Sequence, residues 1–90
     1  MNILEVKIDG RRMKTKELAH EYLSKKRCFP KHYGKNLDAL YDVLTSLRDV
    51  RIDIVFAGSI TANLGDYGQA MLDVFRDAGE NNEFLSVNIK

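Results

Sequence analysis

HYGKNLDALYDVLTSLRD, residues 32–49, carries the clearest structural signal in this chain. Asn36 is a suitable N-cap, because its side chain can accept a hydrogen bond from a free backbone N–H of the first helical turn. After this cap, apolar residues recur every three or four positions, which predicts an amphipathic helix over residues 37–47. The apolar stripe consists of Leu37, Leu40, Tyr41, Leu44 and Leu47.

Another face of this helix carries two acids, Asp38 and Asp42, which lie one above the other because they are four residues apart. A like-charge pair at this spacing destabilises an isolated helix by roughly 0.2–0.5 kcal/mol. The helix dipole favours Asp38 in the first turn but compensates Asp42 less. Just before the helix, His32, Tyr33 and Gly34 place two ring side chains beside a flexible glycine. Two interpretations stay open, a binding surface and a solvated acidic face.

Length and composition predict one domain, residues 1–90, because a chain of this size holds a single hydrophobic core. Hydrophobic residues make up 44% of the chain, which is enough apolar surface to fold. No run approaches the ~20 apolar residues that span a membrane, and no leader is recognisable, so we expect a cytoplasmic protein without a membrane partner. Cys28 is the single cysteine, which excludes an internal disulfide framework and a cysteine-rich zinc site.

Charge is divided unevenly along the chain, although the net charge is only +1. Residues 1–36 contain ten Lys or Arg and four acids, whereas residues 37–90 contain four Lys or Arg and nine acids. A chain divided in this way is predicted to attract different partners with its basic and acidic parts.

Three stretches alternate apolar and polar residues, which predicts strands with one buried face near residues 2–8, 50–56 and 84–89. Helical patterns lie between them, and helical crossovers predict a parallel sheet with right-handed connections. Parallel strands covered on both faces usually read as unbroken apolar runs, whereas these strands alternate. We therefore expect an α/β domain with a three-stranded parallel sheet and three to four helices packed mainly on one face.

The first helix is predicted over residues 16–27, with Thr15 as its N-cap. Cations at residues 25–27 would then lie in its last turn, where the helix dipole favours them. Pro30 prevents the helix from continuing. The residues expected to face inward are Leu18, Ala19, Tyr22 and Leu23.

The last helix is predicted over residues 67–78. Asp66 is its expected N-cap, with Gln69 completing a capping box, and Gly79 is its expected stop. A short helical turn is predicted before it, over residues 59–64.

Motifs of several enzyme classes are missing from the chain. It has no GxGxxG after a strand, no GxxxxGK[ST], no HExxH and no CxxC, so we expect no nucleotide cofactor and no metal. His20 is interpreted as structural filler at the surface, and Cys28 as a partly buried, inert thiol. His32 with Asp38 or Asp42 offers groups for acid–base chemistry, but one histidine with generic carboxylates is a weak signal, and we expect no enzyme.

Two basic stretches permit a nucleic-acid interpretation: RRMK at residues 11–14 and SKKRCFPKHYGK at residues 24–35. Lys and Arg can contact phosphates, and the interleaved Phe29, His32 and Tyr33 can stack on bases. The alternative, which we favour, is a solvated helix end whose cations suit the helix dipole.

The sequence YGKNLDALYD at residues 33–42, followed by Leu44-Thr45, is similar to the signature of the barstar family, intracellular inhibitors of the ribonuclease barnase. The sequence VFRDA at residues 74–78 resembles a second segment of that family. Pro30 also falls where the family has a proline before its binding loop. The predicted order of strands and helices agrees with the barstar fold over essentially the whole chain.

This resemblance implies an inhibitor that plugs the active site of a cognate ribonuclease with residues 32–47. The carboxylate of Asp42 would take the place of a substrate phosphate, Asp38 would pair nearby, and Asp77 would add a contact from the last helix. The implied partner is a secreted-type ribonuclease with a cationic active site, neutralised inside the cell. The resemblance assigns partner contacts to His32, Tyr33, Gly34, Asn36, Leu37, Asp38, Tyr41, Asp42, Thr45 and Asp77.

The chain also departs from the family pattern. His32 replaces a tyrosine, Tyr41 a tryptophan, Lys35 an acid, and Asp77 a glutamate. Barstar is strongly acidic, whereas this chain is close to neutral. Two alternatives to ribonuclease inhibition therefore stay open: a nucleic-acid-binding module that uses residues 11–35, and a barstar-fold binder of another protein.

Overall fold

The structure is a computed structural model that describes residues 2–90. These residues form a three-stranded parallel sheet in the order β1-β2-β3. β2 (Val50–Val55) lies in the middle and pairs with β1 (Leu4–Asp9) on one side and β3 (Leu85–Ile89) on the other. The predicted parallel sheet is confirmed, and each strand lies close to its predicted bounds.

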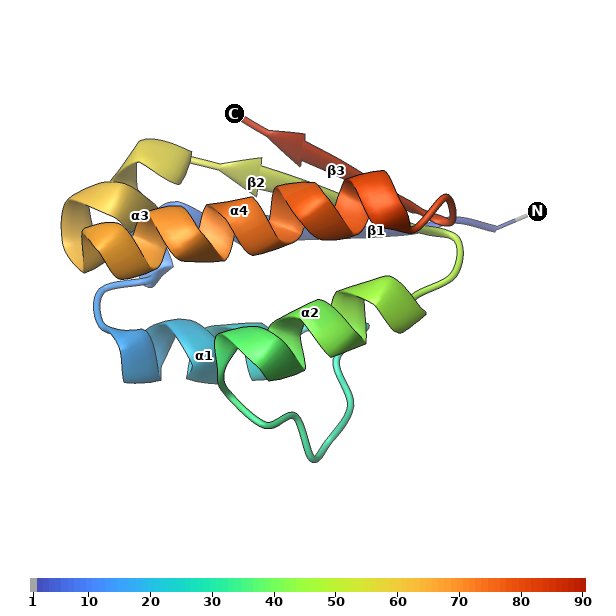
Figure 1. The fold of residues 1–90 in the computed structure, drawn as a ribbon, viewed down its shortest axis with the longest axis horizontal. Coiled ribbons are helices and arrows are strands. Elements are labelled where there is room, and N and C mark those ends of the chain that lie inside the picture. The colour runs from blue at the N-terminus through green and yellow to red at the C-terminus, as the bar shows by residue number, and fades with distance from the viewer. Residues whose placement is uncertain (1) are drawn as a thin grey trace.

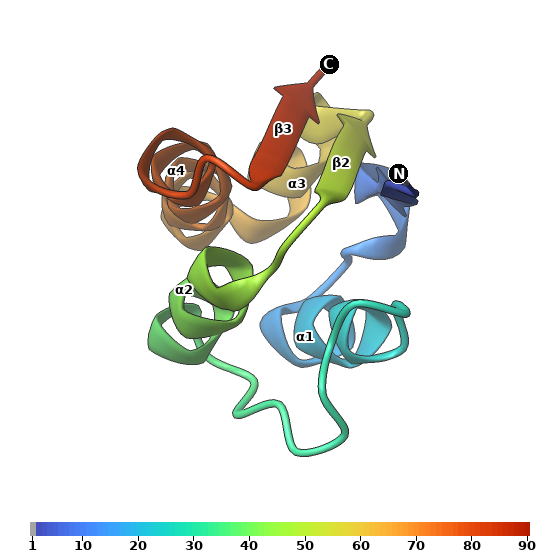
Figure 2. The ribbon, with the colours of Figure 1, turned by 90° about the vertical axis from the view of Figure 1, so that its right-hand side faces the viewer.

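Within the described residues, four α-helices and one 3₁₀ turn connect the strands. The turn η1 (Gly10–Arg12), α1 (Lys16–Ser24) and α2 (Leu37–Ser46) follow β1 in that order. α3 (Ala57–Leu64) and α4 (Asp66–Asn81) lie between β2 and β3. The helices gather on one side of the sheet, and α2 packs along α4 (Figures 1 and 2).

The alternating strands give the sheet one buried and one wet face. Ile8 and Ile52 are fully buried toward the helices, whereas Lys7 and Arg51, which neighbour them in the same strands, are exposed. Packing of the helices mainly on one face is therefore confirmed. The largest fully buried helical side chains are Leu23, Leu40, Leu44, Ile60, Met71 and Phe75.

α1 begins as predicted but ends early. Thr15 caps it, since its hydroxyl accepts a hydrogen bond from the backbone N–H of Leu18 at 3.1 Å. The helix ends at Ser24 and not at residue 27, and the backbone continues with i→i−3 bonds: the N–H of Lys25 donates to the carbonyl of Tyr22 at 3.3 Å, and the N–H of Lys26 donates to that of Leu23 at 3.0 Å. The cations at residues 25–27 therefore follow the helix. Leu18, predicted to face inward, is 52% exposed.

α4 differs from its prediction at both ends. The helix continues through Gly79 to Asn81. The glycine at this position provides space for β3, because a Cβ there would lie 3.1 Å from Cγ2 of Val87. Asp66 is the first helical residue and not the N-cap. Gly65, with φ 60°, ends α3 and caps α4, so the predicted capping box with Gln69 is wrong.

The connection from β2 to α3 contains a left-handed residue. Phe56, predicted to end the strand, has φ 55° and is exposed, and α3 begins directly after it. The predicted helical turn at residues 59–64 is thereby confirmed as part of the longer α3. Gly10 packs against this bend, because a Cβ there would lie 2.2 Å from the carbonyl oxygen of Phe56. The guanidinium of Arg11 lies 4.0 Å from the centroid of the Phe56 ring.

Candidate partner-binding face

The N-terminus of α2 is closed by a side chain. The Oδ1 atom of Asn36 accepts a hydrogen bond from the backbone N–H of Ala39 at 2.7 Å, which confirms the predicted N-cap. Lys35, directly before the cap, has a left-handed φ of 57°. Its Nζ atom lies 2.7 Å from Oε2 of Glu21 on α1, and this ion pair lowers the pKa of the Glu21 carboxyl. The segment between α1 and α2 is therefore tied to α1 where it enters α2.

A buried histidine holds the middle of this segment. Tyr33 is only 6% exposed, and its hydroxyl lies 2.6 Å from Nδ1 of His20 on α1. Nε2 of the same imidazole lies 2.6 Å from the hydroxyl of Tyr67 on α4. The prediction of a surface His20 was wrong, because its two partners come from distant parts of the chain. Burial lowers the pKa of the imidazole, which in its neutral form donates through one ring nitrogen and accepts through the other.

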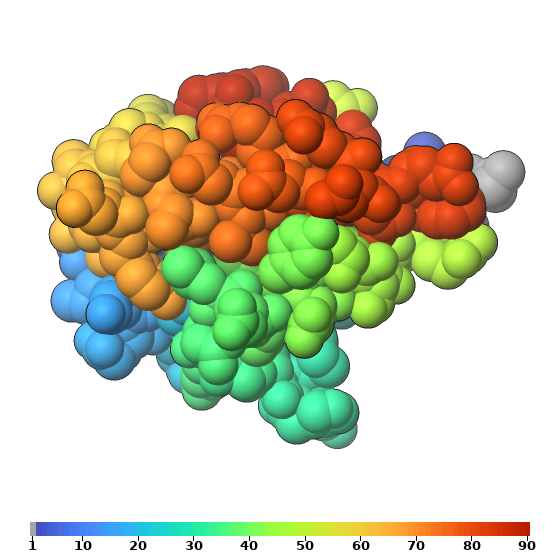
Figure 3. All heavy atoms as spheres, viewed as in Figure 1, coloured from blue at the N-terminus to red at the C-terminus, as the bar shows by residue number. Residues whose placement is uncertain are grey.

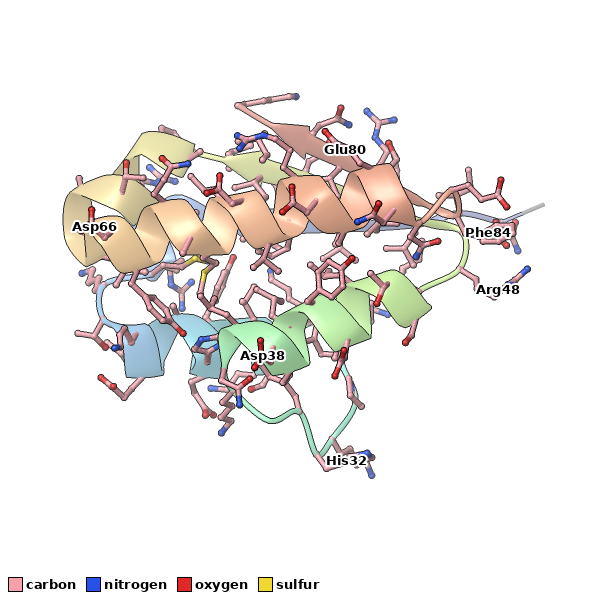
Figure 4. The ribbon with its side chains drawn as sticks, viewed as in Figure 1. His32, Asp38, Arg48, Asp66, Glu80 and Phe84 are labelled. Atoms are coloured by element: carbon pink, nitrogen blue, oxygen red, sulfur yellow. The ribbon has the colours of Figure 1, made fainter. Side chains whose placement is uncertain are left out.

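His32 and Gly34 lie on the outside of the segment. His32 is exposed at its tip, apart from Asp38 (Figure 4). Among residues 2–90 its imidazole has no hydrogen-bond partner, so the acid–base pairing considered for it is not formed in the structure. Gly34 is exposed as well, and a Cβ there would lie 3.0 Å from the Cβ of Ala39. Glycine therefore keeps the segment close to the first turn of α2.

Asp38 and Asp42 lie one turn apart on the exposed face of α2, whereas Leu40 and Leu44 are fully buried. Within residues 2–90, neither carboxylate has a cationic nitrogen within 4.0 Å. Both carboxylates therefore face solvent and are accessible to a partner. The predicted division of α2 into an apolar and an acidic side is confirmed.

The flank of α2 toward α4 is made by half-buried residues, among them Leu37, Tyr41 and Thr45. The hydroxyl of Tyr41 accepts a hydrogen bond from Nδ2 of Asn81 on α4 at 2.9 Å, and the Thr45 hydroxyl donates to the carbonyl of Tyr41 at 2.8 Å. Asp77 is exposed and precedes Asn81 by one helical turn, so it lies on the side of α4 that borders α2. Figure 3 shows α2 in green and α4 in orange to red as one continuous surface.

We call the exposed acids of α2, together with the residues at its border with α4, the α2 face: Asp38, Tyr41, Asp42, Thr45 and Asp77. Helical spacing and the bond between Tyr41 and Asn81 place these five predicted contact residues on adjoining sides of α2 and α4. The structure assigns different places to two others, since Tyr33 points into the protein and Asn36 uses its side chain to cap α2.

The other flank of α2 borders an apolar hollow of about 460 Å³. The Asp42 side chain is part of its wall, so charge and apolar surface lie next to each other. Burial raises the pKa of the Cys28 thiol in the same wall, as predicted for an inert cysteine. The hollow is lined by Cys28, Phe29, Pro30, Asp42, Val43, Ser46 and Leu47.

Asn82, which the sequence did not single out, holds the C-terminal end of α2. Asn82, after α4, is 7% exposed, and its Nδ2 atom donates to the carbonyls of Leu44 at 3.0 Å and Leu47 at 2.8 Å. Its Oδ1 atom accepts from the backbone N–H of Phe84 at 3.0 Å. The side chain thereby satisfies carbonyls that a helix end leaves without partners. The sequence shows only an asparagine in a polar turn, with nothing to indicate these distant acceptors.

The described part of the chain also lacks two kinds of structural feature. Within residues 2–90, no group of three or more His, Cys, Asp or Glu side chains is arranged to hold a metal ion. None of the helices there has the length and apolar composition to cross a membrane. The expected absence of a cofactor stays a prediction.

Comparison with known proteins gives two matches. A family model described as "Barstar (barnase inhibitor)" matches residues 3–89, a range that includes the whole α2 face. A protein of Bacillus subtilis (strain 168), named "Putative ribonuclease inhibitor YrdF", is 40% identical over 75 residues. The aligned residues cover 81% of this chain and 82% of that relative.

Proposed function

This chain belongs to the barstar family of barnase inhibitors, and we propose that it binds a cognate ribonuclease and blocks the active site with its α2 face. The observation that carries the proposal is the pair Asp38 and Asp42, two exposed carboxylates without a counter-charge within 4.0 Å in residues 2–90. Enzymes that act on phosphodiesters place cations around the phosphate. Two carboxylates one turn apart on a helix can pair with those cations in place of the substrate phosphates.

The surroundings of the acids support the same proposal. Tight interfaces combine charged or aromatic anchors with an apolar area that excludes water around them. Here the apolar hollow borders Asp42 on one flank of α2, and Tyr41 and Asp77 extend the face on the other. A buried ion pair in such surroundings is shielded from solvent, which strengthens it.

The residues that depart from the family pattern bear on which ribonuclease this chain binds. Lys35 replaces an acid of the family, but its ammonium is engaged by Glu21, so its charge is directed toward α1. His32 is exposed at the tip of the segment and offers an imidazole where the family offers a phenol. We propose a secreted-type ribonuclease with a cationic active site, neutralised in the cytoplasm before it reaches cellular RNA.

The experiment is a titration of the protein into barnase-type ribonucleases while RNA cleavage is measured. We expect stoichiometric loss of cleavage that is competitive with a nucleotide bound in the active site. The double variant Asp38→Asn, Asp42→Asn should lose this inhibition and keep its fold. Inhibition that a nucleotide does not relieve, or that survives in the double variant, would contradict blockade by the α2 face. Binding to a protein without nuclease activity, lost in the same variant, would favour the alternative of a barstar-fold binder of another kind.

A further inference from the structure

A second hollow, of about 410 Å³, lies on the side of α1 away from His20. Leu18, Tyr22 and Lys25 line it and form one stripe of α1 at helical spacing. His20, by contrast, faces Tyr33 and Tyr67. The cations that line the second hollow are Arg11, Arg12, Lys14 and Lys25.

Three of the four cations that line this hollow form no ion pair within residues 2–90. Arg11 is committed to Asp9 through bonds of 3.1 and 2.9 Å. The carboxylate of Glu21, the one acid in the wall, lies 2.7 Å from the ammonium of Lys35. Among residues 2–90, the remaining three cations of the hollow have no carboxylate oxygen within 4.0 Å. We call Arg12, Lys14 and Lys25 the free cations.

The backbone that carries the free cations is well fixed. Met13, between Arg12 and Lys14, is fully buried, so the two cations flank an anchored residue. The guanidinium of Arg12 lies 5.4 Å from the centroid of the Tyr22 ring. The Tyr22 hydroxyl accepts a hydrogen bond from the backbone N–H of Asp9 at 2.9 Å, which joins α1 to the end of β1. The backbone therefore fixes the positions from which the three side chains extend, and the Tyr22 ring also places the guanidinium of Arg12.

We propose that this hollow binds a chain of phosphate groups. Three cations without counter-charges around one concavity suit a ligand with several adjacent negative charges, and the volume accommodates more than one phosphate. The Tyr22 ring is already covered by Arg12 and by Lys26, whose ammonium lies 4.6 Å from its centroid, so it is not offered to a base. Recognition is therefore of phosphates and not of bases. The phosphates come either from an RNA backbone or from a free polyphosphate.

The test is binding of a fluorescent oligouridylate of about ten nucleotides, a typical length for one site, with tripolyphosphate as the second ligand. Each phosphate contact on a single strand contributes about −0.7 to the slope of log affinity against log salt, so three free cations give a slope of about −2. Affinity should then fall roughly 16-fold between 50 and 200 mM salt. The variant Arg12→Gln, Lys25→Gln should reduce the slope to about −0.7.

A matched control is Arg48→Gln, Lys90→Gln, which removes one arginine and one lysine elsewhere. Arg48 is also stacked on a ring, 4.0 Å from the centroid of Phe84. Binding that is retained in this control and lost in the hollow variant supports the site. If tripolyphosphate binds, is lost in the hollow variant and is retained in the control, while oligouridylate does not bind, the site is supported and free polyphosphate is identified as the source. No binding of either ligand to the parent at 50 mM salt, or equal loss in both variants, overturns the proposal. Thermal unfolding of each variant verifies the fold, and retained ribonuclease inhibition by the hollow variant separates this site from the α2 face.

Discussion

At the scale of the residue, Asp42 combines exposure, an uncompensated charge and an apolar neighbourhood. We expect Asp42→Ala to weaken binding of the cognate ribonuclease by roughly 30-fold to several thousand-fold. Loss of one member of a buried, hydrogen-bonded charge pair costs about 2–5 kcal/mol, a range informed by the barnase–barstar complex itself. Thermal stability should be unchanged or slightly raised, because repulsion from Asp38, worth roughly 0.2–0.5 kcal/mol, is removed.

Asp66→Ala is the matched control, since Asp66 is an exposed acid at the start of α4, away from Asp38 (Figure 4). Inhibition constants and melting temperatures of both variants show whether Asp42→Ala weakens binding without loss of stability. If Asp42→Ala and the parent bind the true partner equally, α2 does not carry the inhibitory surface.

His20 should make stability depend on pH. Burial lowers its pKa from 6.5, so below about that pH the unfolded chain binds more protons than the folded chain. The contribution of neutral His20 to the free energy of unfolding is therefore fully present above pH 6.5 and is lost as the pH falls toward the lowered pKa. We expect the free energy of unfolding, measured in urea, to decrease between about pH 7.5 and 5.5, and to decrease less in His20→Asn.

The comparison variant is His32→Asn, which removes an exposed imidazole at the tip of the segment before α2. It should keep the pH dependence of the parent. The carboxyls of Asp9 and Glu21, whose pKa values are also lowered, titrate below this window. A parent protein whose stability does not change across the window would contradict the assignment to His20.

At the scale of the element, the starts of α1 and α2 were predictable, whereas the cap of α4 and the ends of α1 and α4 were not. Thr15 and Asn36 cap their helices through hydrogen bonds to residues three positions away, so the sequence alone contains both partners. Gly79 was misjudged, because the reason for a glycine there is Val87 on β3. The same distinction holds at the site: the exposure of Asp38 follows from helical spacing, whereas the inward direction of Tyr33 depends on His20.

Asn82 should stabilise the junction of α2 and α4. Asn82→Ala leaves the carbonyls of Leu44 and Leu47 without their side-chain donor, and an unsatisfied buried polar group costs about 1–3 kcal/mol. Asn81→Ala is the control, because it removes only the exposed bond to Tyr41 and should cost about 1 kcal/mol or less. Urea unfolding measures both, and equal losses would show that Asn82 does not hold the helix end.

Two glycines should respond to alanine in opposite directions. A Cβ at Gly68 on α4 would lie 2.4 Å from the carbonyl oxygen of Ile60 on α3, so Gly68→Ala should destabilise the fold by about 1–3 kcal/mol. A Cβ at Gly58 on α3 meets nothing within 4 Å, so Gly58→Ala should stabilise by up to ~1 kcal/mol through helix propensity. Thermal unfolding gives the sign of each change. Stabilisation by both would mean that α3 and α4 can separate without loss.

At the scale of the whole molecule, the order of elements and the parallel sheet followed from alternation and spacing alone. The placement of charge on the folded surface did not. The sequence shows a basic first part and an acidic remainder, but only the structure shows that the cation of Lys35 is engaged by Glu21 and that the free cations line their own hollow on α1.

This distribution predicts how single charges affect association with a cationic partner. Arg48 lies two residues after the end of α2, whereas Arg12 lies on η1 and contacts Tyr22. Exposed charges interact over about 8 Å at 0.15 M salt. Arg48 is only three residues from Thr45 of the α2 face, so we expect it to repel a cationic partner there more strongly than Arg12 does. We expect Arg48→Gln to raise the association rate constant more than Arg12→Gln, with little change in dissociation, because rim charges act mainly on association. Stopped-flow mixing measures both, and the difference should vanish near 1 M salt, where screening acts within about 3 Å. Equal acceleration by both variants would mean that only net charge matters, and slower association of Arg48→Gln would mean that the partner's binding surface is not cationic.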